Sequence, residues 1–277
     1  MNYIGLDEFL LNALKEDIGT GDITTNTCID ASSVSRGRFV AKASGVVCGL
    51  PVLQRVFALL DPHVTVTALC ADGDSVKKGG VIARIEGPSR SILTGERVAL
   101  NLLQHLSGVA TATAAAVRAV AGTGAAIADT RKTTPGMRVL EKYAVKTGGG
   151  SNHRFNLSDG VLIKDNHIAA AGGIAAAVAL VRKNVPHTLK IEVETENMDQ
   201  VREALEAGAD IIMLDNMDNG QMQEAVQYID GRALTEASGN MGERDLHAVA
   251  ETGVDIISIG ALTHTVDALD ISLRFEA

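Results

Sequence analysis

The chain has 277 residues, of which 46% are hydrophobic and 21% charged, and its formal net charge is −9 at pH 7. This is the composition of a soluble globular protein with room for one large domain or two smaller ones. The negative charge, the 3% aromatic content and the lack of tryptophan argue against nucleic-acid binding, which needs a basic face and stacking rings.

The sequence shows no pattern typical of a secreted or membrane-spanning protein. The three cysteines, Cys28, Cys48 and Cys70, form no C-x-x-C pair, so neither a disulfide framework nor a zinc site is expected. No basic start followed by an apolar run marks a signal peptide. The longest low-polarity run, residues 168–181, has 14 residues, whereas crossing a bilayer takes about 20. These features predict a cytoplasmic protein that does not bind membranes.

The first third of the chain mixes short elements. Residues 6–15 have the spacing of an amphipathic helix, and "RGRFVAKASGVVCGL" is typical of strands broken by glycine. "PVLQRVFALL" predicts a helix with Pro51 in its first turn. "VTVTALCADGDSVKKGGVIARIEG" alternates like a hairpin. It is similar to hairpins of lipoyl and biotinyl carrier domains, but Lys77 and Lys78 precede a Gly-Gly, so we favour a structural hairpin. A long helix follows over residues 91–120.

From residue 125 the pattern changes to apolar strands that alternate with helices. The expected strands are "AAIADT", "GVLIK", "LKIEVET", "DIIMLDN", "RALTEASG" and "DIISIGA". Each is almost continuously apolar, as expected where helices cover both faces of a sheet. Helical segments such as "MDQVREALEAGA" and "GERDLHAVAETG" separate several of them. The pattern predicts a βα repeat with a parallel sheet.

Polar or glycine-rich groups follow every one of these strands. They are Asp129 to Lys132, Lys164, Glu194, Asp215, Ser238-Gly239-Asn240 and Gly260-Ala261. Six such strand ends in a row are typical of a (β/α) barrel with its site on the carboxyl face. Because only six strands are evident, we expect an open, incomplete barrel; a doubly wound open sheet is the alternative.

The segment Arg131–Lys164 is strongly basic within this acidic protein. Its cations are Arg131, Lys132, Arg138, Lys142, Lys146, Arg154 and Lys164, against the two acids Glu141 and Asp159. Lys142 and Lys146 are spaced i, i+4, and we interpret them as a solvated helix face. The others stand at segment ends among Gly, Thr and Pro. They predict a local positive pocket for a small anionic ligand.

The residue types suggest a division of roles within that pocket. Arginine binds a carboxylate with two parallel hydrogen bonds, while lysine acts as a point charge for phosphate, which fits Arg131 and Lys132. His153 and Arg154 are an expected anion-binding pair, and the preceding Gly148-Gly149-Gly150 would let the backbone approach a ligand closely. Lys164 is either a carboxylate or phosphate clamp or the Schiff-base lysine of an aldolase-type enzyme.

Carboxylates and glycine loops complete the set. Glu194 and Asp215 end successive strands and suit ribose hydroxyls or Mg²⁺, although a metal-assisted enolisation enzyme would have the same pattern. The glycines at 239 and 260 would open backbone N–H groups to a phosphate where barrels commonly bind one. Together these groups predict a phosphorylated sugar and a small polycarboxylate as ligands.

Longer motifs carry a resemblance over almost the whole chain. "DTRKTTPGMRVLEKYAVKTGGGSNHRFNLSDGVLIKDNHI", "IEVETEN", "IIMLDN", "EASGN" and "DIISIGALTH" resemble the quinolinate phosphoribosyltransferase family, also called carboxylating nicotinate-nucleotide pyrophosphorylases. "EDIGTGDITT" and "GERVALNLLQHLSGVAT" resemble that family's N-terminal domain. The resemblance implies an N-terminal α/β sandwich domain over residues 1–112 and an open (β/α) barrel over 113–277. The last segment is a candidate to pack back on the N-terminal domain.

The resemblance also implies a homodimer and a set of site residues. Arg97 would reach the partner's site and join Thr130, Arg131, His153, Arg154 and Lys164 around the quinolinate carboxylates. Lys132 and Lys164 would face the diphosphate of phosphoribosyl pyrophosphate, and Glu194 and Asp215 would hold ribose hydroxyls and Mg²⁺. Ser238, Gly239, Asn240, Gly260, Ala261 and Leu262 would hold the 5-phosphate, with "SGN" standing where some members have "SGG".

The implied reaction joins the quinolinate ring nitrogen to ribose, expels pyrophosphate and CO₂, and yields nicotinate mononucleotide for NAD synthesis. Lys132, Lys164, Glu194 and Asp215 are the implied catalytic residues, with Mg²⁺ as cofactor. Molybdenum-associated homologues and nicotinate phosphoribosyltransferases share much of the fold. The presence of Arg97, Arg131, His153, Arg154 and Lys164 together favours a dicarboxylate substrate.

Overall fold

The computed structural model describes residues 4–276. The chain divides into two compact units that are not continuous in sequence. One contains the chain up to Ala114, together with Pro135–Gly148 and the segment from Val266 onward; the other contains Ala115–Thr134 and Gly149–Thr265. The expectation placed one boundary after residue 112 and made the last segment a candidate to pack on the N-terminal domain; the assignment of Pro135–Gly148 to the first unit was not expected.

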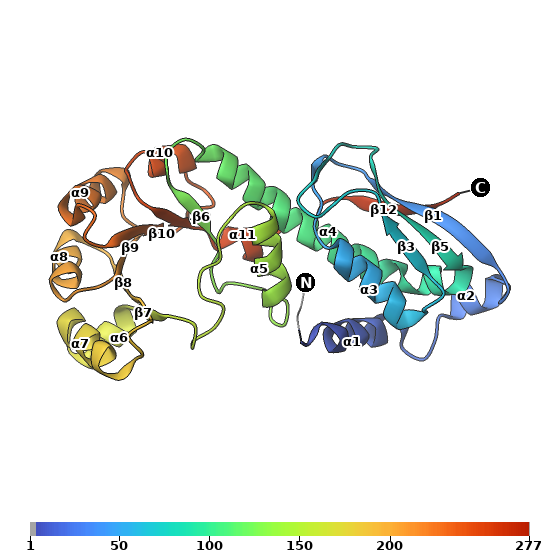
Figure 1. Ribbon diagram of the computed structural model, residues 1–277, viewed down its shortest axis with the longest axis horizontal. Coiled ribbons are helices and arrows are strands. Elements are labelled where there is room, and N and C mark those ends of the chain that lie inside the picture. The colour runs from blue at the N-terminus through green and yellow to red at the C-terminus, as the bar shows by residue number, and fades with distance from the viewer. Residues whose placement is uncertain (1–3, 277) are drawn as a thin grey trace. The chain divides into compact units, whose positions relative to one another are not determined.

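The first unit is built on an antiparallel sheet of order β12-β1-β5-β3 (Figure 1). Its strands are β1 (Val34–Ala41), β3 (Thr65–Ala68), β5 (Val81–Pro88) and β12 (Ile271–Phe275), and β2 (Gly45–Val46) pairs separately with β4 (Ser75–Val76). Its helices are α1 (Leu6–Ile18), α2 (Ile23–Cys28), α3 (Leu50–Leu60), α5 (Arg138–Thr147) and most of α4 (Ser89–Ala119).

Local patterning accounts for most of this unit. Phe39 and Ala41 alternate inward along β1, and the ring of Phe39 lies 6.4 Å from that of Phe57 on α3, which fixes the helix against the sheet. The expected hairpin forms between β3 and β5, but β4 leaves it to pair with β2. Gly79, in the turn after Lys77-Lys78, donates its N–H to the carbonyl of Ala41 at 2.8 Å. The turn is therefore tied to β1 and is not a free hairpin tip.

Helix α5 corrects two expectations. Lys142 is fully buried, so its interpretation as part of a solvated face was wrong; only Lys146 is exposed. The helix is packed on more than one side, because Glu141 pairs with His105 at 2.9 Å and Tyr143 donates to Asp72 at 2.7 Å. Helical spacing reports which residues share a face, but it does not report how many faces are covered.

Gly148, the first glycine after α5, serves packing, which was also not expected. A Cβ on Gly148 would lie 2.7 Å from Cβ of Thr113 on α4, so only glycine permits this close approach of two backbones. None of Gly148, Gly149 and Gly150 lines the cavity described below. The close approach to a ligand that was expected of these glycines therefore has no counterpart in the lining of this cavity.

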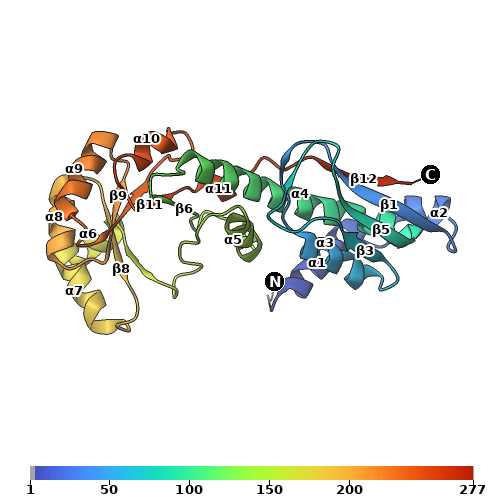
Figure 2. The ribbon, with the colours of Figure 1, turned by 45° about the horizontal axis from the view of Figure 1, so that its top comes forward.

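The second unit is a parallel sheet with all six expected strands. They are β6 (Ala126–Ala128), β7 (Val161–Ile163), β8 (Ile191–Thr195), β9 (Ile211–Asp215), β10 (Leu234–Ser238) and β11 (Ile256–Ser258). The helices are α6 (Asp165–Ala171), α7 (Ile174–Asn184), α8 (Met198–Glu206), α9 (Asn219–Ile229), α10 (Leu246–Ala250) and α11 (Ala261–His264). Helices α7, α8 and α9 follow one another along the outer side of the strands (Figures 1 and 2).

The strand order confirms the open barrel. It is β6-β11-β10-β9-β8-β7, so strands consecutive in the chain are neighbours except β6 and β7, which lie at the two edges. A doubly wound sheet would instead reverse its order at a switch point. The long connection over residues 129–160 replaces the missing strands between β6 and β7. It brings Arg131, Lys132 and Arg154 to the carboxyl ends of the strands, whereas α5, with the other three cations of this connection, belongs to the first unit.

Among residues 4–276, no helix combines the length and the apolar character that crossing a bilayer requires.

Candidate active site

A cavity of about 600 Å³ opens at the carboxyl ends of the parallel strands. Nearly all the sequence-predicted site residues line it: Thr130, Arg131, Lys132, His153, Arg154, Lys164, Glu194, Asp215, Ser238, Gly239, Asn240, Gly260 and Ala261. Three do not. Leu262 is only 5% exposed because α11 turns its side chain into the core. Arg97 lies exposed on α4 in the first unit, and Arg138, which was expected in the positive pocket, begins α5 in that same unit.

Asp129, at the end of β6, organises the basic wall of the cavity. The carboxylate is fully buried and accepts the His153 N–H at 2.8 Å and the Asn152 Nδ2–H at 2.7 Å. The neighbouring backbone is tied as well, because Ser151 forms a parallel bridge with Ala128. These bonds fix the start of the His153-Arg154 segment against the sheet, although that segment belongs to no helix or strand.

Arg154 is held partly out of solvent. Its Nη1 donates to the carbonyl of Gly160 at 3.1 Å. Burial lowers the pKa of Arg154, and the nearby Arg131 cation lowers it further. Because a guanidinium stays charged throughout the physiological range, these two arginines form a positive wall whose mutual repulsion an anion would relieve.

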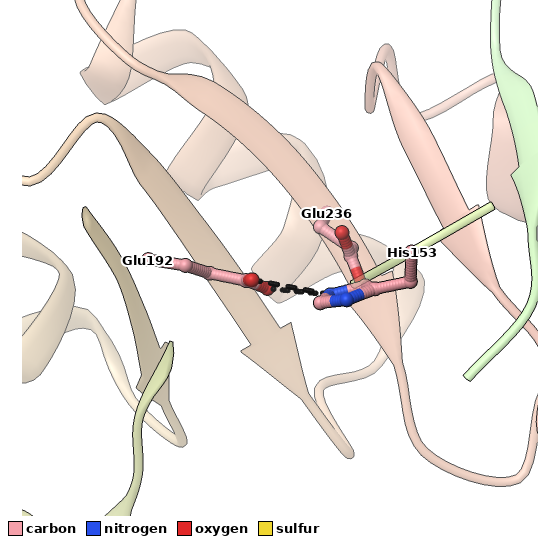
Figure 3. Close-up of side chains that lie close together, drawn as sticks. All are labelled: His153, Glu192 and Glu236. Atoms are coloured by element: carbon pink, nitrogen blue, oxygen red, sulfur yellow. Dashed lines mark hydrogen bonds and ion pairs between the residues drawn. The ribbon is translucent and has the colours of Figure 1, made fainter. Parts of the chain in front are cut away.

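His153 lies between two buried glutamates (Figure 3). Its Nε2 is 3.1 Å from Oε2 of Glu192 and 3.6 Å from Oε1 of Glu236. Its Nδ1 accepts the Arg154 N–H at 2.8 Å, so we assign the ring proton to Nε2, which faces the carboxylates.

The three side chains have the donor set of a metal site, since their ligand atoms lie within 4.8 Å of one another. Coordination would need the lone pair of Nε2, which the assigned tautomer does not offer. We therefore interpret the trio of His153, Glu192 and Glu236 as a hydrogen-bonded network.

Lys164 and two carboxylates form the next part of the rim. Lys164 follows β7, and its Nζ forms an ion pair with Glu194 at the end of β8. Asp215 ends β9 and accepts from Asn216 Nδ2 at 2.6 Å. Glu194 and Asp215 offer the carboxylate oxygens that Mg²⁺ prefers, and both line the cavity. Such an ion would share Glu194 with Lys164 and take further ligands from water and substrate, so these residues fit Mg²⁺.

The loops after β10 and β11 complete the rim. Gly239 has φ +92°, and a Cβ there would lie 2.7 Å from the backbone N of Asn216, so only glycine fits. Asn240 also has a left-handed backbone, with φ 53°. Thr263 Oγ1 donates to the carbonyl of Lys132 at 2.8 Å. This hydrogen bond joins the segment after β11 to the loop after β6.

The sequence reasoning missed several lining residues. They are Leu162, Met213, Glu236, Met241, Gly242, Glu243, Ser258, His264 and Thr265. Glu236 had a usable signal, because it lies two positions before Ser238 on the same strand and so faces the same side. Glu192 had the same relation to Glu194, but nothing in the sequence indicated that either glutamate would contact His153.

The fold and the cavity define a two-domain enzyme of the open α/β-barrel class, with a basic site for anionic ligands at the carboxyl ends of its strands. Two family descriptions match the chain: "Quinolinate phosphoribosyl transferase, N-terminal domain" over residues 22–107 and "Quinolinate phosphoribosyl transferase, C-terminal domain" over residues 109–274. The chain belongs to the quinolinate phosphoribosyltransferase family.

Individual relatives agree with this assignment. A probable nicotinate-nucleotide pyrophosphorylase [carboxylating] of Bacillus subtilis is 47% identical over 273 residues, which are 99% of this chain and 94% of the relative. A mitochondrial quinolinate phosphoribosyltransferase [decarboxylating] of Nicotiana glauca is 42% identical, covering 98% of this chain and 82% of the relative.

Solved structures agree as well. The nicotinate-nucleotide pyrophosphorylase from Ehrlichia chaffeensis superposes with a TM-score of 0.95 at 42% identity, covering 99% of this chain and 100% of that one. A human nicotinic acid phosphoribosyltransferase is 15% identical, with a TM-score of 0.61 and coverage of 100% and 74%, and it shares the fold alone.

Proposed function

We propose that this enzyme transfers the phosphoribosyl group of phosphoribosyl pyrophosphate to quinolinate with decarboxylation. The products are nicotinate mononucleotide, pyrophosphate and CO₂, in the de novo synthesis of NAD. Membership of the family supports the reaction. The reaction is assigned to this cavity because a basic wall, a carboxylate pair and two glycine-containing loops all line it.

The basic wall is the proposed quinolinate site. Arg131 and Arg154 would each hold a carboxylate, with Lys164 beside them and Thr130 and His153 lining the same part of the cavity. A dianion is favoured here because two partly buried guanidinium groups repel each other until negative charge lies between them.

The opposite rim is the proposed site for phosphoribosyl pyrophosphate. Ser238 to Asn240 and Gly260 to Leu262 would surround the 5-phosphate, and Lys132 would face the diphosphate, as it packs beside Gly260. Glu194 and Asp215 would hold ribose hydroxyls and Mg²⁺. When bound there, Mg²⁺ would offset the negative charge of the diphosphate.

The chemistry follows from these placements. The ring nitrogen of quinolinate attacks C1 of the ribose while the bond from C1 to the diphosphate oxygen breaks, and that oxygen takes the electron pair. Lys132 and Lys164 stabilise the leaving diphosphate, and Glu194 and Asp215 stabilise the positive charge that develops on the ribose. The nitrogen, now positively charged, draws electrons from the ring and lets the 2-carboxylate leave as CO₂.

Arg97 is proposed to act in the site of a second copy of the chain. It is exposed on α4, does not line the cavity, and forms no ion pair among the residues that the structure describes. The resemblance assigns its counterpart to the partner's site, and two-fold dimers are the commonest assembly. A homodimer would therefore supply the remaining cation for quinolinate.

A cytoplasmic location stays a prediction from composition; three of the plant relatives are named as mitochondrial and one as chloroplastic.

One assay tests the proposed reaction. The enzyme is incubated with quinolinate, phosphoribosyl pyrophosphate and Mg²⁺, and nicotinate mononucleotide and CO₂ are measured, with a chelator arm for the metal. Equal amounts of both products, lost in the chelator arm, are expected. Two results would count against it: a borohydride-trapped adduct on Lys164 with a carbonyl substrate, or exchange of substrate α-protons without phosphoribosyl pyrophosphate.

A further inference from the structure

Glu236 is a buried acid that the reaction described so far does not use. It lies on β10 and lines the cavity, although it is only 2% exposed. Its Oε1 is buried and accepts no hydrogen bond within 3.5 Å among the described residues; the His153 Nε2–H lies 3.6 Å away, and the Ser258 hydroxyl is also near the carboxyl group. A buried polar oxygen without a partner costs free energy, so such atoms call for an explanation in function.

The surroundings of Glu236 favour the protonated form of its carboxyl group. Glu192 presents a second buried carboxyl whose oxygen lies within 4.8 Å of that of Glu236 (Figure 3). Two carboxylates this close in a desolvated place do not both ionise readily. The His153 Nε2–H is nearer to Glu192, at 3.1 Å against 3.6 Å, and so stabilises the charge there.

The electrostatics agree with this assignment of the proton. Burial raises the pKa of Glu236 to about 7, and the neighbouring Glu192 contributes in the same direction, while His153, Ser258 and Lys164 lower it in part. Near neutral pH a large fraction of Glu236 is therefore a carboxylic acid, able to donate a proton into the cavity.

The proposed reaction needs such a donor. When CO₂ leaves, the bond between C2 of the ring and the carboxyl carbon breaks, and its electron pair stays on C2. A proton must then reach C2. Arg131 and Arg154 do not give up protons at physiological pH, and the Nζ of Lys164 is engaged by Glu194.

The position of Glu236 suits this task. Glu236 lies beside His153, which belongs to the wall proposed for the quinolinate carboxylates. It also lies two residues before Ser238, which belongs to the rim proposed for the 5-phosphate. In the product, the ring nitrogen is joined to the sugar, and C2 is the carbon next to it. An acid between the two half-sites therefore lies where C2 is expected.

We infer that Glu236 is the acid that protonates C2 after CO₂ has left, an inference that rests on the proposed function. The carboxylic O–H of Glu236 breaks and a C2–H bond forms, so the electron pair on C2 is consumed and Glu236 becomes a carboxylate. His153 lies close enough to stabilise the new charge. Solvent returns the proton when the product leaves.

The test is a single turnover with quinolinate carrying ¹⁴C in its 2-carboxylate, with pyrophosphate and CO₂ followed separately. The wild type should release both together. Glu236→Gln should still release pyrophosphate, but CO₂ at least about 100-fold more slowly, the scale of a lost general acid. Without the acid, the carbanion recaptures CO₂, and a nucleotide heavier by one CO₂ should accumulate and be detected by mass.

Two further variants make the result specific. Glu236→Asp keeps an acid and should restore part of the CO₂ release relative to Glu236→Gln, at a similar urea midpoint. Glu192→Gln keeps an oxygen that can accept from His153 but removes the charge that raises the pKa of Glu236, so at neutral pH it should slow CO₂ release more than pyrophosphate release, and lowering the pH should reduce that difference. Equal slowing of both products in Glu236→Gln, or no slowing, overturns the inference. A wild type that releases neither product refutes the proposed reaction and this inference with it, a result visible before any variant is compared.

Discussion

Removing the Asp129 carboxylate should loosen the wall proposed to bind quinolinate. In Asp129→Ala the His153 N–H and the Asn152 amide lose their acceptor, at 2.8 and 2.7 Å. Hydrogen bonds to a charged group contribute about 1.5–3 kcal/mol each, so the two together are worth about 3–6 kcal/mol of unfolding free energy. Asp129→Asn keeps one acceptor oxygen and should lose about half of that.

The functional consequence should be specific to one substrate. His153 and Arg154 follow directly from the segment that Asp129 fixes, whereas the loops at 238–240 and 260–262 follow two other strands, β10 and β11. The KM for quinolinate should therefore rise at least about tenfold in Asp129→Asn, since about 1.4 kcal/mol is a factor of ten. The KM for phosphoribosyl pyrophosphate should change by less than about threefold.

A matched control is available in Asp255. It also accepts two bonds, from Thr235 N at 2.7 Å and Thr235 Oγ1 at 2.8 Å, but it lies at the opposite ends of the strands and does not line the cavity. Asp255→Ala should lower the urea midpoint and leave both KM values near those of the wild type. The reasoning is refuted if Asp129→Asn is folded and less stable but binds quinolinate as well as the wild type does.

Three more predictions concern the dimer, the substrate and the rim. Arg97→Ala and Lys164→Ala should each be nearly inactive, yet their mixture should recover a sizeable fraction of wild-type activity after subunit exchange, because in a mixed dimer one site receives both defects and the other neither. If exchange is verified by mass and no activity returns, Arg97 does not act across subunits. Nicotinate, which lacks the 2-carboxylate, should have a kcat/KM at least about 100-fold below that of quinolinate, because cations in the site stay unpaired; comparable values would point to a nicotinate enzyme. Gly239→Ala should raise the KM for phosphoribosyl pyrophosphate, because its Cβ would lie 2.7 Å from the Asn216 backbone N. Gly122→Ala is the control: it shares the positive φ, at +87°, with open space around it, so it should cost only the strain of about 1–2 kcal/mol, and an equal KM effect in both would contradict the prediction.

The sequence by itself determined the local features of this protein. Apolar runs such as Val161–Ile163 and Ile211–Asp215 specify strands because their patterning is a property of neighbouring residues. The alternation of six strands with helices predicted the parallel sheet. The polar residues at the strand ends predicted where the candidate site lies, because the carboxyl ends of parallel strands meet at one edge.

Only the tertiary structure decided what depends on distant parts of the chain. Lys142 was expected in solvent and is buried, and Gly148 packs against α4 where a ligand contact had been expected. The network of His153, Glu192 and Glu236 joins a loop to two strands, 39 residues or more apart in sequence. No spacing rule relates such residues, because their proximity results from the closure of the sheet and from the path of the chain between β6 and β7.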